Sequence, residues 1–358
     1  MKNVKENLLS NIVLLRCFAI LVVVLGHSMI IYSDNWSIFQ ARNQSVFFSI
    51  VKKYIDIFQM PLFIFVSGYV YSFVKLERHK YKDFIPFLKN KFKRLIIPFV
   101  CVAVFYVLPI RKLVHYEPYE GQSFLTFLFE NVLLGKDTGH LWYLPTIFFI
   151  FLIFYLIENR VLRKSPYLIN LLVLGILSCV CSLLPDILYI KFVTQYLLFF
   201  YLGYLIRDLL KDRERKKERT NITYVLIMIL FLLQFVGLVF NNLLSEYASQ
   251  PVYSLIITVG QRVGSVCSIL FFYFLFVKIN DVFPRLSENK YINFVDKESF
   301  PIYLFHSPII YIMLFFLADK DINPFVLISI NFIVCTLGSI LISKGIQKTN
   351  KLNFIIGK

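Results

Sequence analysis

The sequence contains five histidines, whose imidazole side chains can accept or donate a proton near neutral pH. His79 and His115 stand in segments rich in charged residues, and we expect both to be ordinary solvated side chains. The other three, His27, His140 and His306, fall in or beside long apolar runs. An ionisable group in such a run costs free energy unless it faces other helices or water, so these three are the candidates for proton-transfer chemistry.

Arg16 and His27 stand eleven residues apart in the first apolar run, NIVLLRCFAILVVVLGHSM. Eleven residues make about three turns of an α-helix, so the two side chains share one face and are separated by a rise of about 16 Å. If the run starts in the cytoplasm, Arg16 lies in the inner half of the bilayer and His27 in the outer half. The simpler alternative is that Arg16 reaches the inner headgroups and His27 bonds a neighbouring carbonyl.

Two further residues are candidates for work beside His27. Asp56 begins the second apolar run, YIDIFQMPLFIFVSGYVY, at a depth similar to that of His27, where a carboxylate would fix the imidazole tautomer and stabilise its protonated form. The alternative for Asp56 is a carboxylate that faces water at the membrane surface. His306 lies between Pro301 and Pro308 in ESFPIYLFHSPII, where it is structural, catalytic or part of a proton relay.

The segment GHLWYLPTIF places His140 and Trp142 at the outer mouth of a later apolar run. A tryptophan at that level is usually part of the aromatic belt of the membrane interface. The alternative is that Trp142 lines a binding site, while His140 contacts the bound molecule or shares in proton transfer. The long connection before them, near residues 111–140, is where such a molecule could dock.

Lys91, Lys93 and Arg94 cluster where the sequence NKFKRLIIPF enters the third apolar run. Cations at such a position can act simply as a signal that orients the chain in the membrane. They can also hold the phosphate groups of a cytosolic molecule, because ammonium and guanidinium groups form charge-assisted hydrogen bonds with phosphate oxygens. Lys91 and Arg94 are therefore the candidates for a phosphate site on the cytoplasmic side.

The composition identifies lipid as the solvent for most of the chain. Hydrophobic residues make up 58% of the 358 residues and the mean hydropathy is +0.68, more than one soluble core could bury. The formal charge of +16 comes from Lys and Arg in short connections between apolar runs, which fits anionic headgroups and argues against nucleic acid as a partner. The six cysteines fall inside apolar runs without ligand-like spacing, so we expect no disulfide and no metal site.

Apolar runs long enough to cross a hydrocarbon layer of roughly 30 Å recur from end to end. They predict an all-α, polytopic membrane helix bundle of about ten transmembrane helices, in a single domain over residues 1–358 with its core at about 10–345. Strongly basic connections alternate with poorer ones, and this alternation predicts that both termini are cytoplasmic. The helices are expected near residues 10–32, 54–74, 93–110, 141–158, 167–185, 190–207, 222–241, 253–278, 299–318 and 324–343.

Taken together, these segments resemble the integral-membrane acyltransferase-3 family, and the resemblance runs from about residue 10 to residue 345. The HLWYLP element makes the chain most similar to the glycan O-acetyltransferase branch of that family. One departure concerns the second cytoplasmic connection, where many members carry two arginines three residues apart and this chain has Lys91 and Arg94. The matching segments are LLRCFAILVVVLGHS, FQMPLFIFVSGY, KFKRLIIPF, HLWYLP, FFYLGYLIR and IYLFHSP.

The resemblance implies ten core helices, an acyl-CoA donor in the cytoplasm, and an acceptor hydroxyl at or beyond the outer face. It assigns essential roles to the positions of Arg16 and His27. We therefore expect transfer of an acyl group from acetyl-CoA, or succinyl-CoA, to a surface glycan such as a capsule, wall or exopolysaccharide. His27 would act as a general base oriented by Asp56, or would accept the acyl group transiently.

The main alternative is a transporter or flippase for a polysaccharide or a lipid-linked sugar, in which the same Arg and His would form a substrate or proton path. No sequence repeat relates the two halves of the chain, which argues against an inverted-repeat transporter. A receptor or scaffold is a weaker alternative. The abundance of Lys, Ile, Asn and Phe is compatible with a low-GC bacterium, so the expected location is the plasma membrane, as a multi-pass protein.

Overall fold

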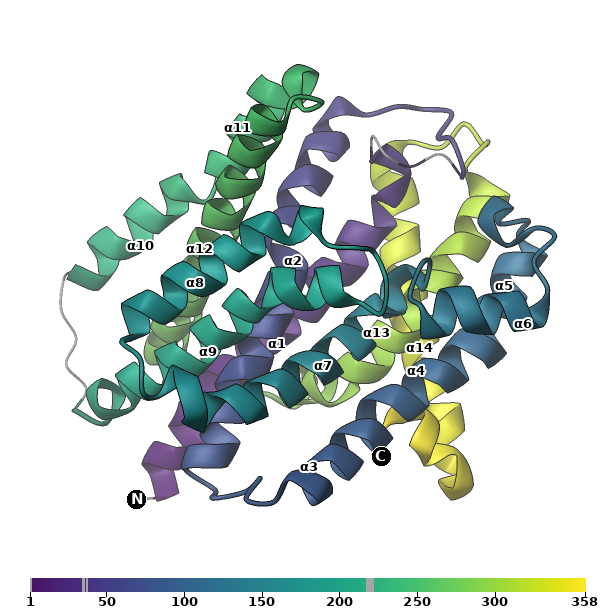
Figure 1. Ribbon diagram of the computed structural model, residues 1–358. Helices are drawn as coiled ribbons and strands as arrows, with labels where there is room; N and C mark the ends of the chain where they lie inside the picture. Colours follow the sequence, from purple (N-terminus) through teal and green to yellow (C-terminus); the bar gives the residue numbers. More distant parts are fainter. Residues whose placement is uncertain (1, 34–35, 37, 217–221) are drawn as a thin grey trace.

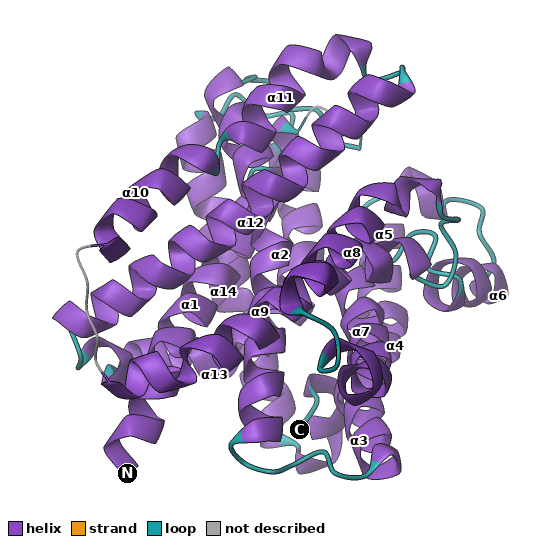
Figure 2. Cartoon of the chain, turned by 60° about the vertical axis from the view of Figure 1, so that its left-hand side comes forward, coloured by secondary structure: helices purple, strands orange, loops and turns teal. Residues whose placement is uncertain are grey.

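The computed structural model describes residues 2–33, 36, 38–216 and 222–358, and every regular element within these ranges is a helix (Figures 1 and 2). The α-helices are α1 (Lys2–Ser28), α2 (Val46–Leu76), α3 (Phe84–Lys91), α4 (Ile97–Val102), α5 (Leu108–Leu113), α6 (Phe124–Thr126), α7 (Tyr143–Ile157), α8 (Tyr167–Val180), α9 (Ile190–Lys216), α10 (Ile222–Leu233), α11 (Val236–Leu244), α12 (Pro251–Val282), α13 (Lys290–Leu317) and α14 (Pro324–Lys348). Wider π-type turns join α3, α4 and α5 into one continuous segment, Phe84–Leu113.

Eight helical segments among the described residues are long and apolar enough to cross a membrane, which confirms the predicted all-α membrane bundle. All ten expected positions are helical, but α8 and α9 do not meet that criterion. The apolar stretch of α8, Tyr167–Leu183, is short, and α9 carries Gln195 and Arg207 within its apolar sequence. The eight segments are Ser10–Ser28, Val46–Leu76, Phe84–Leu113, Gly139–Leu162, Tyr224–Tyr247, Pro251–Val282, Lys290–Leu317 and Pro324–Lys348.

The two ends of the chain lie at the same side of the bundle (Figure 1). This arrangement is the one that two cytoplasmic termini require, and their cytoplasmic location itself stays a prediction. Helix α1 contacts α2, α12, α13 and α14, and its residues Leu15, Ala19 and Val23 are fully buried. The helix that carries Arg16 and His27 is therefore an inner helix of the bundle.

Helices α2 and α13 begin eight and nine residues earlier than expected, at Val46 and Lys290 instead of 54 and 299. The apolar runs end where charged residues begin, but those charges have partners in the structure. Lys52 pairs with Asp56 within α2, and Asp296 at the start of α13 pairs with Arg16 of α1. Because these pairs satisfy the charges, the helices continue through them.

Helices α2 and α9 approach each other closely at two glycines. A Cβ atom on Gly68 would lie 2.0 Å from the carbonyl oxygen of Phe200, and one on Gly203 would lie 2.0 Å from that of Phe65. Small residues allow this kind of backbone contact between membrane helices. The pair holds α2, which packs against α1, at a fixed distance from α9.

Substitution of Gly203 by alanine is expected to destabilise the fold by about 1–3 kcal/mol, because the added methyl group must push two backbones apart. The measurement is the melting temperature of the purified protein in detergent. Gly175→Ala is the matched control, since a Cβ atom at Gly175 of α8 meets no atom within 4 Å. Equal melting temperatures for the two variants would contradict the close contact.

Candidate active site

The three histidines singled out in the sequence come together in space. His306 of α13 lies beside His27 of α1, with its Nε2 atom 3.3 Å from the Nδ1 atom of His27. The ring of His140, just before α7, has its centre 5.2 Å from that of His306, and the rings of His27 and His306 have centres 4.9 Å apart. We call these three residues the histidine cluster. His140 and His306 are buried, whereas His27 is partly exposed.

The hydrogen bonds of the cluster indicate where its protons lie. The Nδ1 atom of His27 is 2.9 Å from the Val23 carbonyl oxygen, and that of His306 is 3.0 Å from the Ile302 oxygen and 2.8 Å from the Tyr303 oxygen. A carbonyl oxygen can only accept, so we assign a hydrogen to both Nδ1 atoms. His306 Nε2 then accepts from His27 Nδ1, and the Nε2 atom of His27 keeps a lone pair. That lone pair gives His27 the form of a general base.

His140 is held from two sides. Its Nε2 atom lies 3.0 Å from the carbonyl oxygen of Leu304, and its own carbonyl oxygen accepts a hydrogen bond from the hydroxyl of Tyr303. Its Nδ1 atom is buried and has no hydrogen-bond partner within the described ranges. The Leu304 oxygen can only accept, so Nε2 carries the hydrogen and the unpaired Nδ1 is an acceptor, which is costly for a buried atom.

A buried guanidinium fixes the loop that leads to His140. Arg111 is 2% exposed, and its Nη1 atom donates to Asp137 at 3.2 Å. The same carboxylate accepts from the backbone N–H of Gly139 at 3.1 Å and from the hydroxyl of Tyr116 at 2.9 Å. Gly139 has a φ of +53°, and a Cβ atom there would lie 2.0 Å from Arg111 Nη2. Only glycine fits this turn, and the network determines where His140 starts.

Two tyrosines complete this network as neutral donors. The hydroxyl of Tyr119 accepts from Arg111 at 2.9 Å and donates to the carbonyl oxygen of Asp137 at 2.8 Å. Burial raises the pKa of both Tyr116 and Tyr119, so both phenols keep their protons and donate them to Asp137. The sequence placed Arg111 in an outer loop and did not anticipate that tyrosines and a carboxylate would bury it.

Arg16 forms a two-pronged ion pair with Asp296 of α13. Its Nε atom lies 2.5 Å from Oδ1 and its Nη2 atom 2.6 Å from Oδ2. Asp296 precedes His306 by ten residues on α13, as Arg16 precedes His27 by eleven on α1. The two helices therefore run parallel, with an ion pair at one level and two histidines about 16 Å further along. The Arg16 side chain is about one third exposed, at 34%, so it is not closed off from a further anion.

Asp56 does not orient His27, which corrects the sequence-based expectation. Its carboxylate pairs with Lys52, one turn earlier on α2, and accepts from the Nε2 atom of Gln59 at 2.6 Å. Gln59 in turn lies against α1, since a Cβ atom on Gly26 would be 2.7 Å from its Oε1 atom. The carbonyl of Val23 and the ring of His306, described above, hold the imidazole instead.

Trp142 packs between helices. Its indole stacks on Phe192 and Tyr196 of α9, with ring centres 4.6 Å and 5.1 Å apart. These contacts attach the start of α7 to α9. A role of Trp142 in lining a binding site stays a prediction.

The candidates for a phosphate site lie on and beside α3. The Nζ atom of Lys91 is 3.4 Å from the ring centre of Phe151 and 5.2 Å from that of Tyr81, while Lys93 and Arg94 are exposed. Aromatic faces attract a cation in this way, so Lys91 has a fixed position. Its neighbour Tyr81 belongs to the wall of a pocket.

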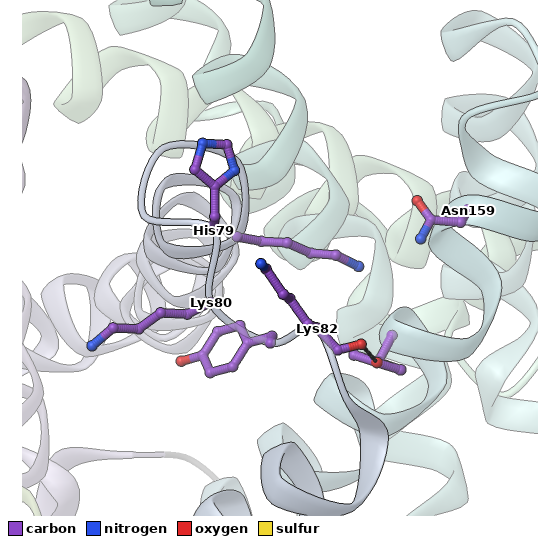
Figure 3. A pocket seen from close by; sticks show the side chains of 7 residues that line it. His79, Lys80, Lys82 and Asn159 are labelled. Atoms are coloured by element: carbon purple, nitrogen blue, oxygen red, sulfur yellow. Dashed lines mark hydrogen bonds between the residues drawn. The ribbon is translucent and has the colours of Figure 1, made fainter.

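This pocket has a volume of about 340 Å³ and is rich in cations (Figure 3). His79 and Tyr81 have φ angles of +50° and +64°, a strained conformation for residues with a side chain, and such strain often marks functional sites. In Figure 3, the loop carries His79, Lys80 and Lys82, and Asn159 lies on a facing element. Its lining residues are Lys75, His79, Lys80, Tyr81, Lys82, Tyr155 and Asn159, and we call it the lysine pocket.

One carboxylate already neutralises part of the lysine pocket. Lys75 pairs with Glu158, whose fully buried carboxylate also accepts from the hydroxyls of Tyr71 and Tyr204, both at 2.9 Å. Lys80 and Lys82 add two further cations. The pocket therefore suits an anion such as a phosphate group. From the sequence alone, His79 is expected to be an ordinary solvated side chain. The sequence does not reveal the lysine pocket, because this pocket forms between a loop and a helix that is distant along the chain.

Comparison with known proteins identifies the family of the chain. A family model described as an acyltransferase domain matches residues 9–344, which is nearly the whole chain. Comparison with the curated proteins and with the solved structures gives no significant match. The matched range includes the histidine cluster, the Arg16–Asp296 pair and the lysine pocket. The chain therefore belongs to the acyltransferase-3 family of membrane acyltransferases.

Proposed function

We propose that this membrane acyltransferase moves an acyl group, in the first instance acetyl, from cytoplasmic acyl-CoA to a hydroxyl of an extracytoplasmic surface glycan. The observation that carries the proposal is the pairing of α1 and α13. It puts a partly exposed cation at one level of the bundle and a histidine with an open Nε2 lone pair about 16 Å above it. A phosphate-bearing donor and an acceptor hydroxyl need these two kinds of group. The proposed setting is the plasma membrane of a bacterium.

The donor side of the proposal rests on cations. Arg16, Lys91 and Arg94 would hold the phosphates of acetyl-CoA or succinyl-CoA, because guanidinium and ammonium groups bind phosphate oxygens through charge-assisted hydrogen bonds. The lysine pocket beside Lys91 supplies Lys80 and Lys82 to the same end. The acyl-bearing arm of the donor would then follow α1 from the level of Arg16 toward His27.

The chemical step would be carried by the lone pair on His27 Nε2. It would take the proton of the acceptor hydroxyl while that oxygen attacks the thioester carbonyl, so a C–O bond forms and the C–S bond breaks. The proton would pass from His27 to the departing CoA thiolate. The positive charge that develops on the His27 imidazole is stabilised by the hydrogen bonds of its Nδ1–H group to the Val23 carbonyl oxygen and to Nε2 of His306. The same lone pair could instead attack the thioester and form an acyl-histidine, which the hydroxyl would then resolve.

The family match supports a transferase over the transporter considered from the sequence. The direct test uses radiolabelled acetyl-CoA and detergent-purified protein, supplied with surface glycan extracted from the source cells. We expect label to move to the glycan. If neither acetyl-CoA nor succinyl-CoA is consumed, the proposal fails and the result favours a transporter.

Replacement of Gly139 by alanine is expected to lower kcat for transfer by about 10²-fold. The added methyl group would displace Arg111 and so move His140 out of its position in the histidine cluster. The measurement is the initial rate of transfer. Gly121→Ala is the matched control, since Gly121 also has a positive φ, +71°, but a Cβ atom there meets nothing within 4 Å. A loss of equal size in both variants would point to backbone strain in place of the Arg111 network.

A further inference from the structure

A second pocket lies just beyond the end of α1 that carries His27. It has a volume of about 420 Å³ and is formed by the turn that follows α1, Ile30–Tyr32, by the loop after it, and by the first turn of α2. Ile31 lies four residues after His27, about 6 Å along a helix axis. One residue of the pocket wall therefore follows the proposed base by about one helical turn along the chain.

The lining of this pocket combines aromatic rings with neutral polar groups. Tyr32, Trp36 and Phe39 contribute the rings, and Gln40 and Gln44 contribute amides. Three serine hydroxyls complete the polar part of the wall, those of Ser33, Ser45 and Ser49. In contrast to the lysine pocket, none of its described lining residues carries a charge at neutral pH. Such a wall suits a neutral ligand that has both apolar faces and hydroxyl groups.

We propose that this pocket binds one neutral sugar residue of the acceptor glycan and presents its hydroxyl to His27. A sugar ring has C–H faces that pack on aromatic side chains and hydroxyls that both donate and accept hydrogen bonds. Amides and serine hydroxyls match those hydroxyls because each can also donate and accept. The proposal rests on the proposed function, for which it names the acceptor-binding site.

The rings of the pocket are held in place by α13. Trp36 packs on Tyr311 with ring centres 5.4 Å apart, and Phe39 packs on the same tyrosine at 6.4 Å. Tyr311 lies five residues after His306 on α13. One helix thus fixes both the partner of His27 and the aromatic wall of the pocket. A ring bound on that wall would keep a constant position relative to the histidine cluster.

Trp36 carries a donor that is not satisfied within the described part of the chain. Its Nε1 atom is buried and makes no hydrogen bond there. Buried tryptophan N–H groups usually have a partner, because an unpaired donor is costly. A small rearrangement on binding would let a sugar oxygen accept this hydrogen. The indole is therefore both a contact surface and a reporter of binding.

The chain offers a direct test because it contains only two tryptophans, Trp36 and Trp142. In the full-length Trp142→Phe variant, Trp36 is the single indole. We expect a saturable change in its fluorescence on titration with methyl glycosides of glucose, galactose or N-acetylglucosamine, or with glycan extracted from the source cells. Trp36→Phe, in which Trp142 remains, is the control and should show no saturable change at the same sugar concentrations, because the pocket has lost the indole on which the sugar would pack. Adenosine 3′,5′-bisphosphate, which resembles the nucleotide part of CoA, should leave the emission of Trp36 unchanged, because none of the described lining residues is a cation that would bind its phosphates.

A second variant tests the polar wall. Gln40→Ala in the Trp142→Phe background should raise the Kd for the sugar about tenfold, as expected for one lost hydrogen bond. Gln250→Ala, an exposed glutamine in a different loop, should leave that Kd unchanged. No response of Trp36 to any glycoside or to the extracted glycan would overturn the pocket assignment. Sugar binding without any acyl transfer would keep the pocket and overturn the proposed function, since the fluorescence assay needs no acyl-CoA.

Discussion

The His27→Ala variant is expected to lose transfer of acyl groups to glycan by about 10²- to 10⁴-fold, the range typical for removal of a general base. The reason is specific to this residue. Its Nε2 atom is the one in the His27–His306 pair that keeps a lone pair open to a substrate, because Nε2 of His306 already accepts from Nδ1 of His27. The measurement is the rate of label transfer from radiolabelled acetyl-CoA by purified protein.

His115→Ala is the matched control, since His115 is an exposed histidine whose partner is Glu120 at 3.7 Å. It should transfer at the rate of the wild type. His306→Asn should show a smaller loss than His27→Ala, because His306 positions the base and shares its charge without contacting the acceptor in this account. A His27→Ala variant that folds and keeps wild-type transfer would remove His27 from the mechanism.

The Arg16→Ala variant is expected to lower kcat/KM for acyl-CoA by about 10²-fold, with most of the loss in KM. Loss of a charge-assisted hydrogen bond to a phosphate costs about 1.5–3 kcal/mol, which corresponds to this factor. Arg16→Lys should recover only part of it, because lysine keeps the charge but lacks the planar set of N–H donors with which a guanidinium can hold Asp296 and a phosphate at the same time. The measurement is the dependence of the initial rate on acyl-CoA concentration.

The pairing with Asp296 requires a control, because loss of Arg16 also leaves a mostly buried carboxylate without its partner. Asp296→Asn removes the ion pair but keeps the guanidinium. If Arg16 binds the acyl-CoA donor, the Asp296→Asn variant should have a lower melting temperature than the wild type and keep most of its affinity for acyl-CoA. Arg285→Ala, an exposed arginine in another basic connection, should change neither property. Equal loss of acyl-CoA affinity in Arg16→Ala and Asp296→Asn would mean that Arg16 acts only through the ion pair.

The sequence identified the three histidines because each is a rare titratable group in apolar surroundings. Helical periodicity also placed Arg16 and His27 on one face. The sequence could not show that His140 and His306, which are 166 residues apart, would form one cluster with His27, because that depends on how α7 and α13 pack. The helix positions followed from apolar runs, whereas their ends did not, since ion pairs extend α2 and α13 past those runs.

Two residues that the sequence did not single out take their roles from tertiary contacts. Asp296 lay outside the apolar run that defined its helix, and it matters because Arg16 faces it. Arg111 falls at the start of the long connection near residues 111–140, yet Asp137 and a set of tyrosines bury it. Asp56 was assigned to His27 on depth alone, but Lys52 lies one turn away on the same helix and takes its carboxylate. Local spacing cannot rank such competing partners.

The most direct test of the central claim is a transfer assay across a sealed membrane. The protein is reconstituted in liposomes with radiolabelled acetyl-CoA on the side that carries the lysine pocket and extracted surface glycan on the other side. We predict that wild-type protein labels the glycan, and that His27→Ala does not although it is folded and inserted. Passage of unmodified glycan across the membrane with no acetyl-CoA consumed would contradict the account and indicate a transporter.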